Sequence, residues 1–399
     1  MKEVLMVLPH MVGGGAERVA AMLVNYFDKN GIKSKIVLTA DYSKDVVRHE
    51  LKEDIPLILL PEVMKKETLT EKIKYYPAKV ISKVFCHLFE ALHKPVPACL
   101  AYLSIIWQHH REIDYLRKMI SKRKDTTVIA FLQPAIPLVL LATRKLPNKV
   151  IISERCDPNR LMKKRYGKHF IEKYYTRADK AVFQTIEAKA VYPKHIADKG
   201  LVIENPIKKD LPESYHGERN KVITTFCRIS EQKNLPIMID AFAKLYKEYP
   251  EYTLRIIGDA PNEEGIRVRK QIVEQMKRLG IDSAVEMVPF MNRVHEAIIN
   301  DAMYVNSSDY EGMSNAMLEA MAIGMPVVCT DCPIGGAHAA IQHGENGLLV
   351  PVKDSPALYM AMKQIVEDEE FSKQLSENAA KIREKLSLEN IARQWMELL

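Results

Sequence analysis

The chain has 399 residues, enough for about two domains, and 47% of them are hydrophobic, enough for two buried cores. No stretch approaches the ~20 apolar residues that cross a bilayer, and the first apolar run is too short for a signal peptide, so the sequence predicts a cytoplasmic protein. Residues 1–200 hold 36 Lys and Arg against 21 Asp and Glu, whereas the remainder holds 22 against 30. The basic half lacks the interleaved aromatic platforms and recognition-helix pattern of nucleic-acid binders, so no nucleic-acid partner is expected.

The first predicted strand, residues 4–8, runs into a glycine-rich loop. Gly14 and Gly15 belong to this loop, and Glu17 and Arg18 follow at the start of the next helix. Consecutive glycines let the backbone approach a ligand closely, but they also suit a purely structural strand-to-helix turn. Their spacing is not that of a dinucleotide-binding loop.

Residues 65–124 mix apolar and aromatic side chains, such as Tyr75, Phe85 and Trp107, with Lys and Arg. This pattern predicts several helices with an exposed apolar and cationic face. Such a face can lie on an anionic membrane, where each basic residue near the surface contributes about 1 kcal/mol. The alternative is that these helices pack as an extra layer on the first domain.

A cluster of charged residues follows the predicted strand 150–153, namely Glu154, Arg155 and Arg160, with Pro158 between them. In a parallel sheet these side chains would lie at the carboxyl edge, facing a cleft between domains. Glu154 could orient a donor sugar or an acceptor hydroxyl, and the two arginines could meet an acceptor's phosphate. A structural role for the whole cluster is the alternative.

The second half alternates predicted strands and helices, which is typical of a parallel sheet. Strands are expected at 222–226, 254–257, 285–288 and directly before Ser308. Ligands bind beyond the carboxyl ends of such strands, where Arg228, Lys233, Gly258 and Glu311 would all lie. Further on, residues 326–330 form another predicted strand, and the glycine-punctuated segment 344–350 is interpreted as a hairpin-like return.

Two glutamates, Glu311 and Glu319, flank the predicted start of a helix near Ser314. The free N–H groups of a helix start make an anion site. The segment suits a nucleotide sugar: one carboxylate would accept the sugar hydroxyls, the amides would bind the diphosphate, and the other carboxylate would accept the ribose hydroxyls. An ordinary capped helix with two surface glutamates is the alternative. The remaining residues expected at the donor are Gly312, Met313, Asn315 and Ala316.

Together these motifs resemble the donor-binding domain of the family 4 retaining glycosyltransferases, in particular those of bacterial capsule and exopolysaccharide synthesis. The resemblance covers about half of the chain. It rests on the Arg-x4-Lys of Arg228 and Lys233, the Glu-x7-Glu of Glu311 and Glu319, Asn205 with Pro206, and the segment 344–350. The family's histidine near residue 154 is replaced here by Ser-Glu-Arg, which leaves the role of Glu154 open.

The resemblance implies the α/β GT-B fold, with two Rossmann-like domains facing each other across a cleft. The expected domains are an acceptor-binding domain at 1–205 and a nucleotide-sugar-binding domain at 206–382. A last helix at 383–399 is expected to cross back to the first domain.

The resemblance also implies a metal-independent hexosyltransferase that uses a UDP-sugar, with no cofactor. The expected acceptor is a polyprenyl-diphosphate-linked glycan at the inner face of the cell membrane, where the enzyme would be peripherally bound. Alternatives are a sugar-nucleotide epimerase of the same fold and a non-catalytic nucleotide-sugar binder. The implied residues are Glu311, Arg228, Lys233 and Glu154 for catalysis, Gly14, Gly15, Gly258, Gly312, Met313, Ser314, Asn315, Ala316 and Glu319 for the donor, and Glu17, Arg18, Arg155 and Arg160 for the acceptor.

A metal site is not expected anywhere in the chain. The sequence has no Asp-x-Asp motif of the kind that holds a metal beside a diphosphate. Cys329 and Cys332 have the spacing of half a zinc site, but no second ligand pair accompanies them. A structural role is therefore expected for both cysteines, and fixed cations are expected to carry the charge of the leaving group.

Overall fold

The computed structural model describes residues 2–40, 51–64, 68–92, 97–163 and 167–399. It divides the chain into two compact units: unit 1 comprises Met1–Glu204 and Ile391–Leu399, and unit 2 comprises Asn205–Asn390. The division lies one residue before the expected boundary, and the return to unit 1 begins at Ile391 instead of residue 383. Over the described ranges, no helix combines the length and the apolar character needed to cross a bilayer.

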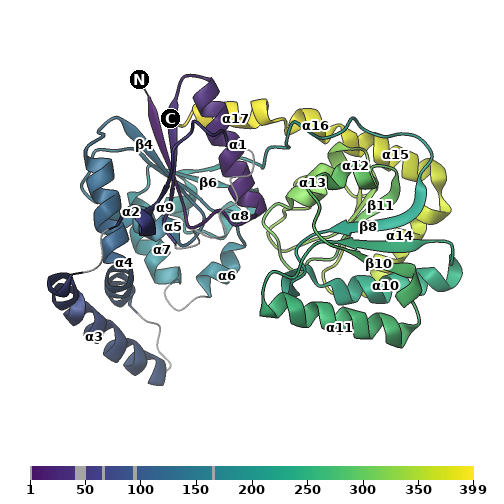
Figure 1. Cartoon of the computed structure of the whole chain (residues 1–399), viewed down its shortest axis with the longest axis horizontal. Coiled ribbons are helices and arrows are strands. Elements are labelled where there is room, and N and C mark those ends of the chain that lie inside the picture. Colours follow the sequence, from purple (N-terminus) through teal and green to yellow (C-terminus); the bar gives the residue numbers. More distant parts are fainter. Residues whose placement is uncertain (1, 41–50, 65–67, 93–96, 164–166) are drawn as a thin grey trace. The chain divides into compact units, whose positions relative to one another are not determined.

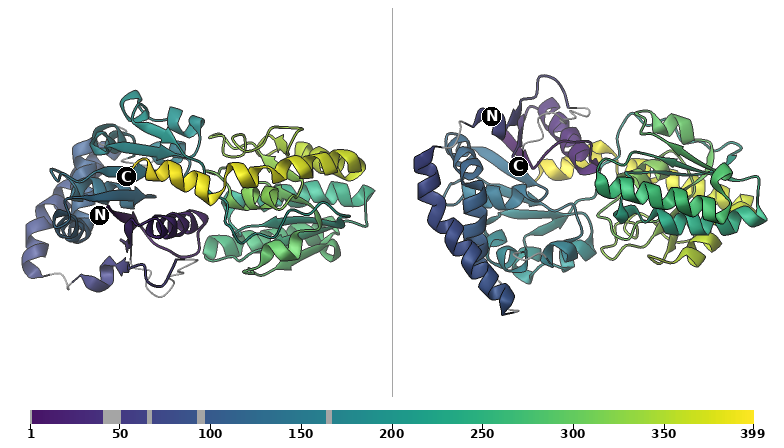
Figure 2. Two further views of the ribbon diagram at one scale, coloured as in Figure 1. Left: turned by 90° about the horizontal axis from the view of Figure 1, so that it is seen from above. Right: turned by 60° about the horizontal axis from the view of Figure 1, so that its bottom comes forward.

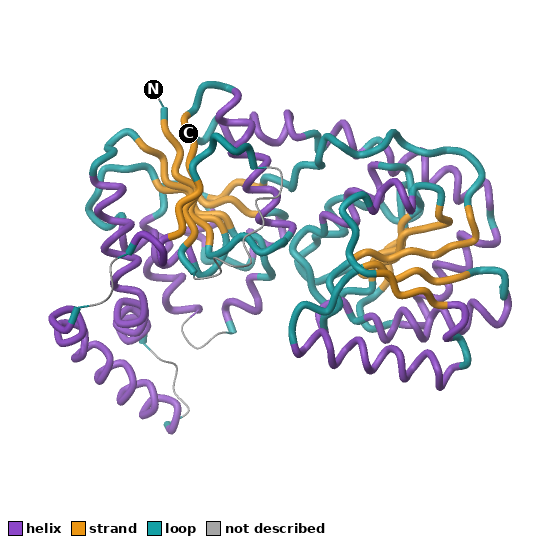
Figure 3. The backbone as a smooth tube through the Cα atoms, viewed as in Figure 1, coloured by secondary structure: helices purple, strands orange, loops and turns teal. Residues whose placement is uncertain are grey.

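Unit 1 is built on a seven-stranded parallel sheet, in which the strands follow the order β3-β2-β1-β4-β5-β6-β7. Its central strand β4 is buried along its whole length, as expected for a parallel sheet covered by helices on both faces. In Figure 3 the strands lie between the helices in each unit. The strands are β1 (Glu3–Leu8), β2 (Lys33–Leu38), β3 (Leu57–Leu59), β4 (Thr126–Phe131), β5 (Val150–Ser153), β6 (Lys180–Phe183) and β7 (Gly200–Val202).

Most helices of unit 1 pack on this sheet, and α5 is buried at every position. They are α1 (Gly15–Lys29), α2 (Leu60–Val63), α3 (Leu69–Ala91), α4 (Ala98–Ser121), α5 (Ala135–Ala142), α6 (Pro158–Met162), α7 (Gly167–Tyr174), α8 (Ile186–Ala190), α9 (Lys194–Ala197) and the end of α17 (Leu388–Met396).

The basic segment 65–124 contains two long helices with different surroundings; its residues 65–67 and 93–96 lie outside the described part of the chain. Helix α4 packs on the core of unit 1 through Ile113, Leu116 and Ile120. Helix α3 packs against α4 and forms the outer layer (Figure 1). Tyr75 of α3 stacks on His110 of α4, with 3.9 Å between the ring centroids. The expected extra layer is therefore present in α4, whereas α3 keeps an exposed apolar face.

The end of the chain completes the core of unit 1. Trp395 of α17 is fully buried, and its ring centroid lies 6.2 Å from that of Phe131 at the end of β4. Lys2 donates a hydrogen bond from Nζ to the carbonyl oxygen of Leu399 at 3.0 Å, so both described ends of the chain lie together in unit 1 (Figure 2). Residues Ile391–Leu399 therefore belong to unit 1.

Unit 2 is built on a six-stranded parallel sheet, in which the strands follow the order β10-β9-β8-β11-β12-β13. The interpretation of segment 344–350 as a hairpin-like return is wrong: β13 runs parallel to β12, because the intervening loop carries the chain back to the end of the sheet where β12 began. The strands are β8 (Asn220–Phe226), β9 (Thr253–Ile257), β10 (Val285–Val288), β11 (Asp301–Asn306), β12 (Val327–Thr330) and β13 (Leu348–Val350).

The helices of unit 2 lie on both faces of its sheet, with α10 and α11 on one face and α12 and α13 on the other (Figure 1). Helix α10 is amphipathic, because Met238, Ile239 and Phe242 are buried in the core. The helices are α10 (Leu235–Glu248), α11 (Glu263–Leu279), α12 (Val294–Ile298), α13 (Asn315–Ala322), α14 (Ser355–Glu367), α15 (Glu369–Ala380) and α16 (Ile382–Lys385).

Candidate functional site

In the sheet of unit 2, successive strands are added in one direction from β8 and in the opposite direction from β11. From β8 the chain continues to β9 on one side, whereas from β11 it continues to β12 on the other. The loops after these two strands diverge at such a point and leave a crevice at the carboxyl edge of the sheet, which is where doubly wound sheets bind ligands. The first loop carries Arg228 and Lys233, and the second carries Glu311.

Lys233 and Glu311 form an ion pair across the two loops. Their side chains are 15% and 14% exposed, so the pair is largely shielded from water. Burial is the largest single influence and lowers the pKa of Lys233, but the charge and hydrogen bond of Glu311 together with Cys227 raise it, so the pKa lies above its ordinary value and the ammonium stays charged. Arg228 is exposed nearby on the same loop. The structure thus brings together the predicted cations and the first predicted carboxylate.

Neighbouring side chains hold the Glu311 carboxylate in place. Ser308 lies 2.9 Å from Oε1 through its hydroxyl, and Gln232 donates from Nε2 to Oε2 at 3.2 Å. Asn234 ties the two loops together, because its Nδ2 donates to Oδ1 of Asp309 at 2.7 Å. The sequence does not indicate Gln232 and Ser308 as site residues. Gln232 directly precedes Lys233, and Ser308 lies three residues before Glu311.

Helix α13 begins where the sequence predicts. Ser314 is its N-cap, and its side chain accepts a hydrogen bond from the backbone N–H of Met317. Asn205, at the start of unit 2, donates from Nδ2 to the carbonyl oxygen of Met313 at 3.1 Å and to Oδ1 of Asn315 at 2.7 Å. The cap and this asparagine fix the segment that carries the predicted diphosphate amides.

Two glycines let the loops of the crevice approach one another. A Cβ at Gly258, whose φ is +146°, would lie 1.9 Å from the carbonyl oxygen of Cys227. A Cβ at Gly336 would lie 1.6 Å from the carbonyl oxygen of Gly312. The close approach of these backbones therefore requires glycine at both positions.

Glu319, the second predicted carboxylate, is 4% exposed and lies one turn inside α13. Its Oε2 is 2.8 Å from Nε2 of His295, which is 3% exposed and belongs to α12. The alternative of two surface glutamates is therefore wrong for Glu319. No sequence pattern connects His295 with Glu319, because the contact depends on two helices that follow different strands.

In unit 1, Glu154 follows β5 directly and lies at the carboxyl edge of that sheet. Its Oε1 accepts hydrogen bonds from Tyr175 at 2.5 Å and from Nε2 of Gln133 at 2.9 Å. Burial and the nearby carboxylate raise the pKa of Tyr175 well above its ordinary value, so the hydroxyl keeps its proton and donates. Glu154 is thus a buried acceptor, and the sequence does not predict its partners Tyr175 and Gln133.

Arg155 lies in the core of unit 1, which corrects its predicted role at an acceptor phosphate. Its guanidinium carbon lies 4.8 Å from the centroid of Phe131 and 5.4 Å from that of Trp395, and Nε donates to Ser153 Oγ at 2.9 Å. The side chain is 6% exposed, and its guanidinium is used for these contacts within the unit. The ring of Trp395, which the last helix supplies, covers this arginine.

Glu17 is predicted to bind the acceptor, but its carboxylate is instead used within the glycine-rich loop. Oε2 accepts from the backbone N–H of Val12 and of Gly14, both at 2.8 Å, and Oε1 lies 2.8 Å from His10 Nδ1. The side chain is buried. A Glu at the third helical position of α1 is a capping-box signal, and this signal in the sequence could have indicated the local role.

The other predicted residues of unit 1 are accessible. Gly14 is the N-cap of α1 and Gly15 is its exposed first residue. Arg18 is partly exposed on α1, and Arg160 is exposed on α6. Their roles toward a donor or an acceptor stay predictions.

Cys329 and Cys332 lie at and just after the end of β12, and both are buried. Burial raises the pKa of the Cys332 thiol to about 12 and raises that of Cys329 further. Both thiols are therefore protonated and unreactive near neutral pH. This agrees with the structural role predicted for them.

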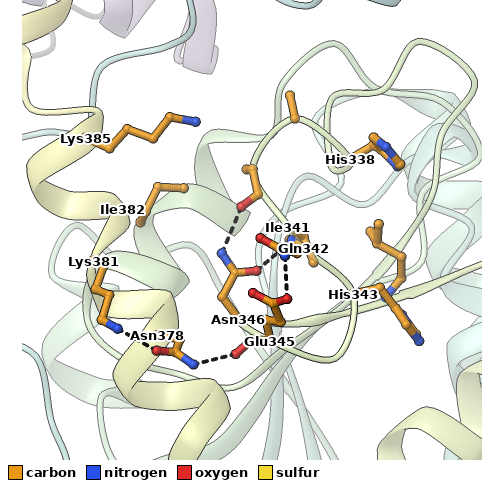
Figure 4. A pocket seen from close by; sticks show the side chains of 13 residues that line it. His338, Ile341, Gln342, His343, Glu345, Asn346, Asn378, Lys381, Ile382 and Lys385 are labelled. Carbon is orange, nitrogen blue, oxygen red and sulfur yellow. Dashed lines mark hydrogen bonds between the residues drawn. The ribbon is translucent and has the colours of Figure 1, made fainter.

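A hollow in unit 2 lies between the segment 338–349 and helices α15 and α16 (Figure 4). Several of its polar side chains bond to one another. Lys381 donates from Nζ to Asn378 Oδ1 at 2.7 Å, and Asn378 donates from Nδ2 to the carbonyl oxygen of Glu345 at 2.9 Å. Gln342 donates to the carboxylate of the same Glu345. Because these groups face one another, we assign no ligand to this hollow and place the candidate site at the crevice.

Residues 207–382, almost the whole of unit 2, match the family described as glycosyl transferases group 1. The chain is similar to an uncharacterized glycosyltransferase of Haemophilus influenzae, with 26% identity over 226 residues that cover 56% of this chain and 62% of the relative. It is also similar to the N-acetylgalactosamine-N,N'-diacetylbacillosaminyl-diphospho-undecaprenol 4-alpha-N-acetylgalactosaminyltransferase of Campylobacter jejuni, with 26% identity over 263 residues, 62% of this chain and 68% of the relative. The alignments span less than two thirds of the first three curated relatives.

Among solved structures, the chain resembles the Anabaena protein HepE in complex with UDP and glucose. The TM-score is 0.77 at 18% identity, with 99% of this chain and 98% of the other covered. The likeness confirms the predicted fold class, α/β with two Rossmann-like domains of the GT-B type.

Proposed function

We propose that this chain is a retaining glycosyltransferase that moves a hexose or an N-acetylhexosamine from a UDP-sugar to a glycan acceptor. The observation that carries the proposal is the contact between Lys233 and Glu311 at the switch point of unit 2. Transfer requires positive charge for the departing diphosphate and acceptors for the sugar hydroxyls, and this pair supplies both. The match to group 1 glycosyl transferases and the UDP-bound HepE neighbour support the proposal.

The proposed mechanism divides the donor among the groups of the crevice. Lys233, Arg228 and the amides at the start of α13 stabilise the leaving diphosphate, and we propose that these fixed charges make a metal unnecessary. Glu311 holds the hydroxyls of the sugar, and Glu319 holds those of the ribose. The acceptor oxygen bonds to the anomeric carbon on the face that the phosphate leaves, and a phosphate oxygen takes the acceptor's proton. This front-side route retains the configuration and needs no side-chain base.

We further propose that the acceptor is a polyprenyl-diphosphate-linked saccharide in bacterial surface-polysaccharide synthesis. The name of the Campylobacter relative, whose acceptor carries diphospho-undecaprenol, supports this class. In unit 1, the exposed Arg160 is the cation proposed to meet the acceptor's diphosphate, while Glu154 is held ready to accept a hydrogen bond from a sugar hydroxyl.

Calorimetric titration of UDP, GDP and a panel of UDP-sugars in the presence of EDTA tests the donor site. We expect UDP to bind without metal, GDP to bind more weakly, and one UDP-sugar to be preferred. The products formed from the preferred UDP-sugar distinguish the alternatives. An epimerase would convert this UDP-sugar into its epimer without an acceptor, and a non-catalytic binder would bind it without forming UDP. If none of the nucleotides binds, the proposed donor site is wrong.

Peripheral membrane binding is a further part of the proposal, and helix α3 is the element proposed to contact the membrane. Its exposed apolar side chains lie beside Lys72 and Lys83, so one face offers both apolar and cationic groups. These apolar residues are Leu69, Ile73, Tyr76, Val80, Ile81, Val84, Phe85 and Leu88.

We expect the protein to sediment with vesicles that contain an anionic lipid and to stay in solution with purely zwitterionic vesicles. The substitution Ile73→Ser should reduce the bound fraction several-fold, because it removes an apolar side chain that is 64% exposed on α3. Ile266→Ser is a matched control, since Ile266 is 60% exposed on α11 of unit 2. Equal sedimentation with both kinds of vesicle would contradict membrane binding through this face.

A further inference from the structure

His295 and Glu319 form a buried pair at the donor crevice, and no motif of the sequence includes the histidine. The distance from His295 Nε2 to Glu319 Oε2 is 2.8 Å, and the two side chains are 4% and 5% exposed. An ionised carboxylate can only accept a hydrogen bond, so Nε2 carries the hydrogen in this contact. The pair connects α12 to α13, two helices that follow different strands of the sheet.

The imidazole ring of His295 is itself held by the strand that leads into the crevice. Phe226, the last residue of β8, packs edge-on against it, with 5.5 Å between the ring centroids and an interplanar angle of 83°. Two residues beyond Phe226 lies Arg228. The ring therefore connects the end of β8, whose loop bears the cations of the site, with the carboxylate on α13.

A glutamate side chain has three rotatable bonds, and fixing them when a ligand binds costs conformational entropy. A carboxylate that must present its oxygens to two neighbouring hydroxyls binds more tightly if this cost is met before the ligand arrives. His295 provides such fixation, since its own orientation is set by Phe226 on one side and its N–H is directed at Oε2 on the other.

From this geometry we infer that His295 is a positioning residue for the donor nucleoside, which orients Glu319 toward the ribose hydroxyls. The inference rests on the proposed function, in which Glu319 binds the ribose. His295 then helps the site to distinguish ribose from deoxyribose, although it does not itself contact the donor.

The test compares the affinities of UDP and 2′-deoxy-UDP, measured by calorimetry on the full chain. Wild-type protein should bind UDP roughly 10-fold or more tightly than 2′-deoxy-UDP, because the deoxy compound lacks one hydrogen bond to a charged group. His295→Phe keeps an aromatic ring against Phe226 but removes the donor, and it should bring the ratio close to one. His295→Gln places an amide nitrogen near the position of Nε2 and should restore most of the ratio.

The outcomes separate the inference from the function on which it rests. If wild-type protein binds both nucleotides equally, Glu319 does not bind the ribose, and the proposed ribose contact and this inference both fail. If wild-type protein discriminates and His295→Phe discriminates equally well, only the inference fails.

A His295→Phe variant whose affinities for both nucleotides fall by the same factor shows a merely structural role of His295 and also overturns the inference. In combination with Glu319→Gln, His295→Phe should lower the ratio no further, because both act through one carboxylate.

Discussion

Replacing Lys233 with Ala is expected to lower the turnover number by roughly 10²- to 10³-fold, the loss that follows removal of one preorganised charge-stabilising donor. The ammonium is needed most when the diphosphate departs, because negative charge on the leaving group is then greatest. Its contact with Glu311 holds it at the crevice before the donor arrives. The measurement is the steady-state rate of UDP release with the UDP-sugar that the titration identifies.

Lys270→Ala is the matched control for this substitution. Lys270 also pairs with a glutamate in unit 2, but it lies on α11 and is 79% exposed, so its replacement should leave the rate within experimental error. A Lys233→Ala variant with a raised KM and an unchanged turnover number would mean that the ammonium binds substrate and transition state equally. That result would contradict the proposed role at the leaving group.

Replacing Glu319 with Gln is expected to raise the dissociation constant of UDP roughly 10- to 100-fold, with a much smaller change in turnover. Hydrogen bonds to a charged group contribute about 1.5–3 kcal/mol, and the ribose contacts are the same in the ground state and the transition state. Gln is chosen because it keeps the size of the buried side chain beside His295. The dissociation constant is measured by calorimetry, and thermal unfolding checks that the variant is folded.

The matched control is Glu296→Gln, since Glu296 belongs to α12 like His295 and is half exposed. This substitution should not change UDP affinity. A Glu319→Gln variant that binds UDP like the wild type, but turns over slowly, would place Glu319 at the reacting sugar instead of at the ribose.

Local patterns in the sequence predict the parts of the fold that depend on local chemistry. The run of apolar residues in β11 and the capping residue Ser314 predict a strand and a helix start, and both are present. The carboxyl-edge rule then predicts that Lys233 and Glu311 lie at one edge of the sheet. The strand order, which places their two loops side by side, is known only from the structure.

Contacts between segments distant in the sequence cannot be predicted in this way. Arg155 is the second residue after β5 and is expected at a ligand, yet Trp395, which lies 240 residues further along the chain, covers it. The pairing of His295 with Glu319 likewise depends on how two helices pack. The predicted direction of β13 is wrong for a related reason, since turn residues indicate where a chain bends but not how far it travels before the next strand.

The burial of Trp395 in unit 1 also determines when that unit can finish folding during synthesis. Residues 391–399 leave the ribosome only after the whole of unit 2, which takes roughly 10–40 s to translate at ~5–20 residues per second. Throughout this interval Phe131 and Arg155 lack the indole ring that covers them in the finished structure. The nascent first unit therefore exposes apolar surface while the second unit folds, and this surface is available to chaperones until the last helix docks.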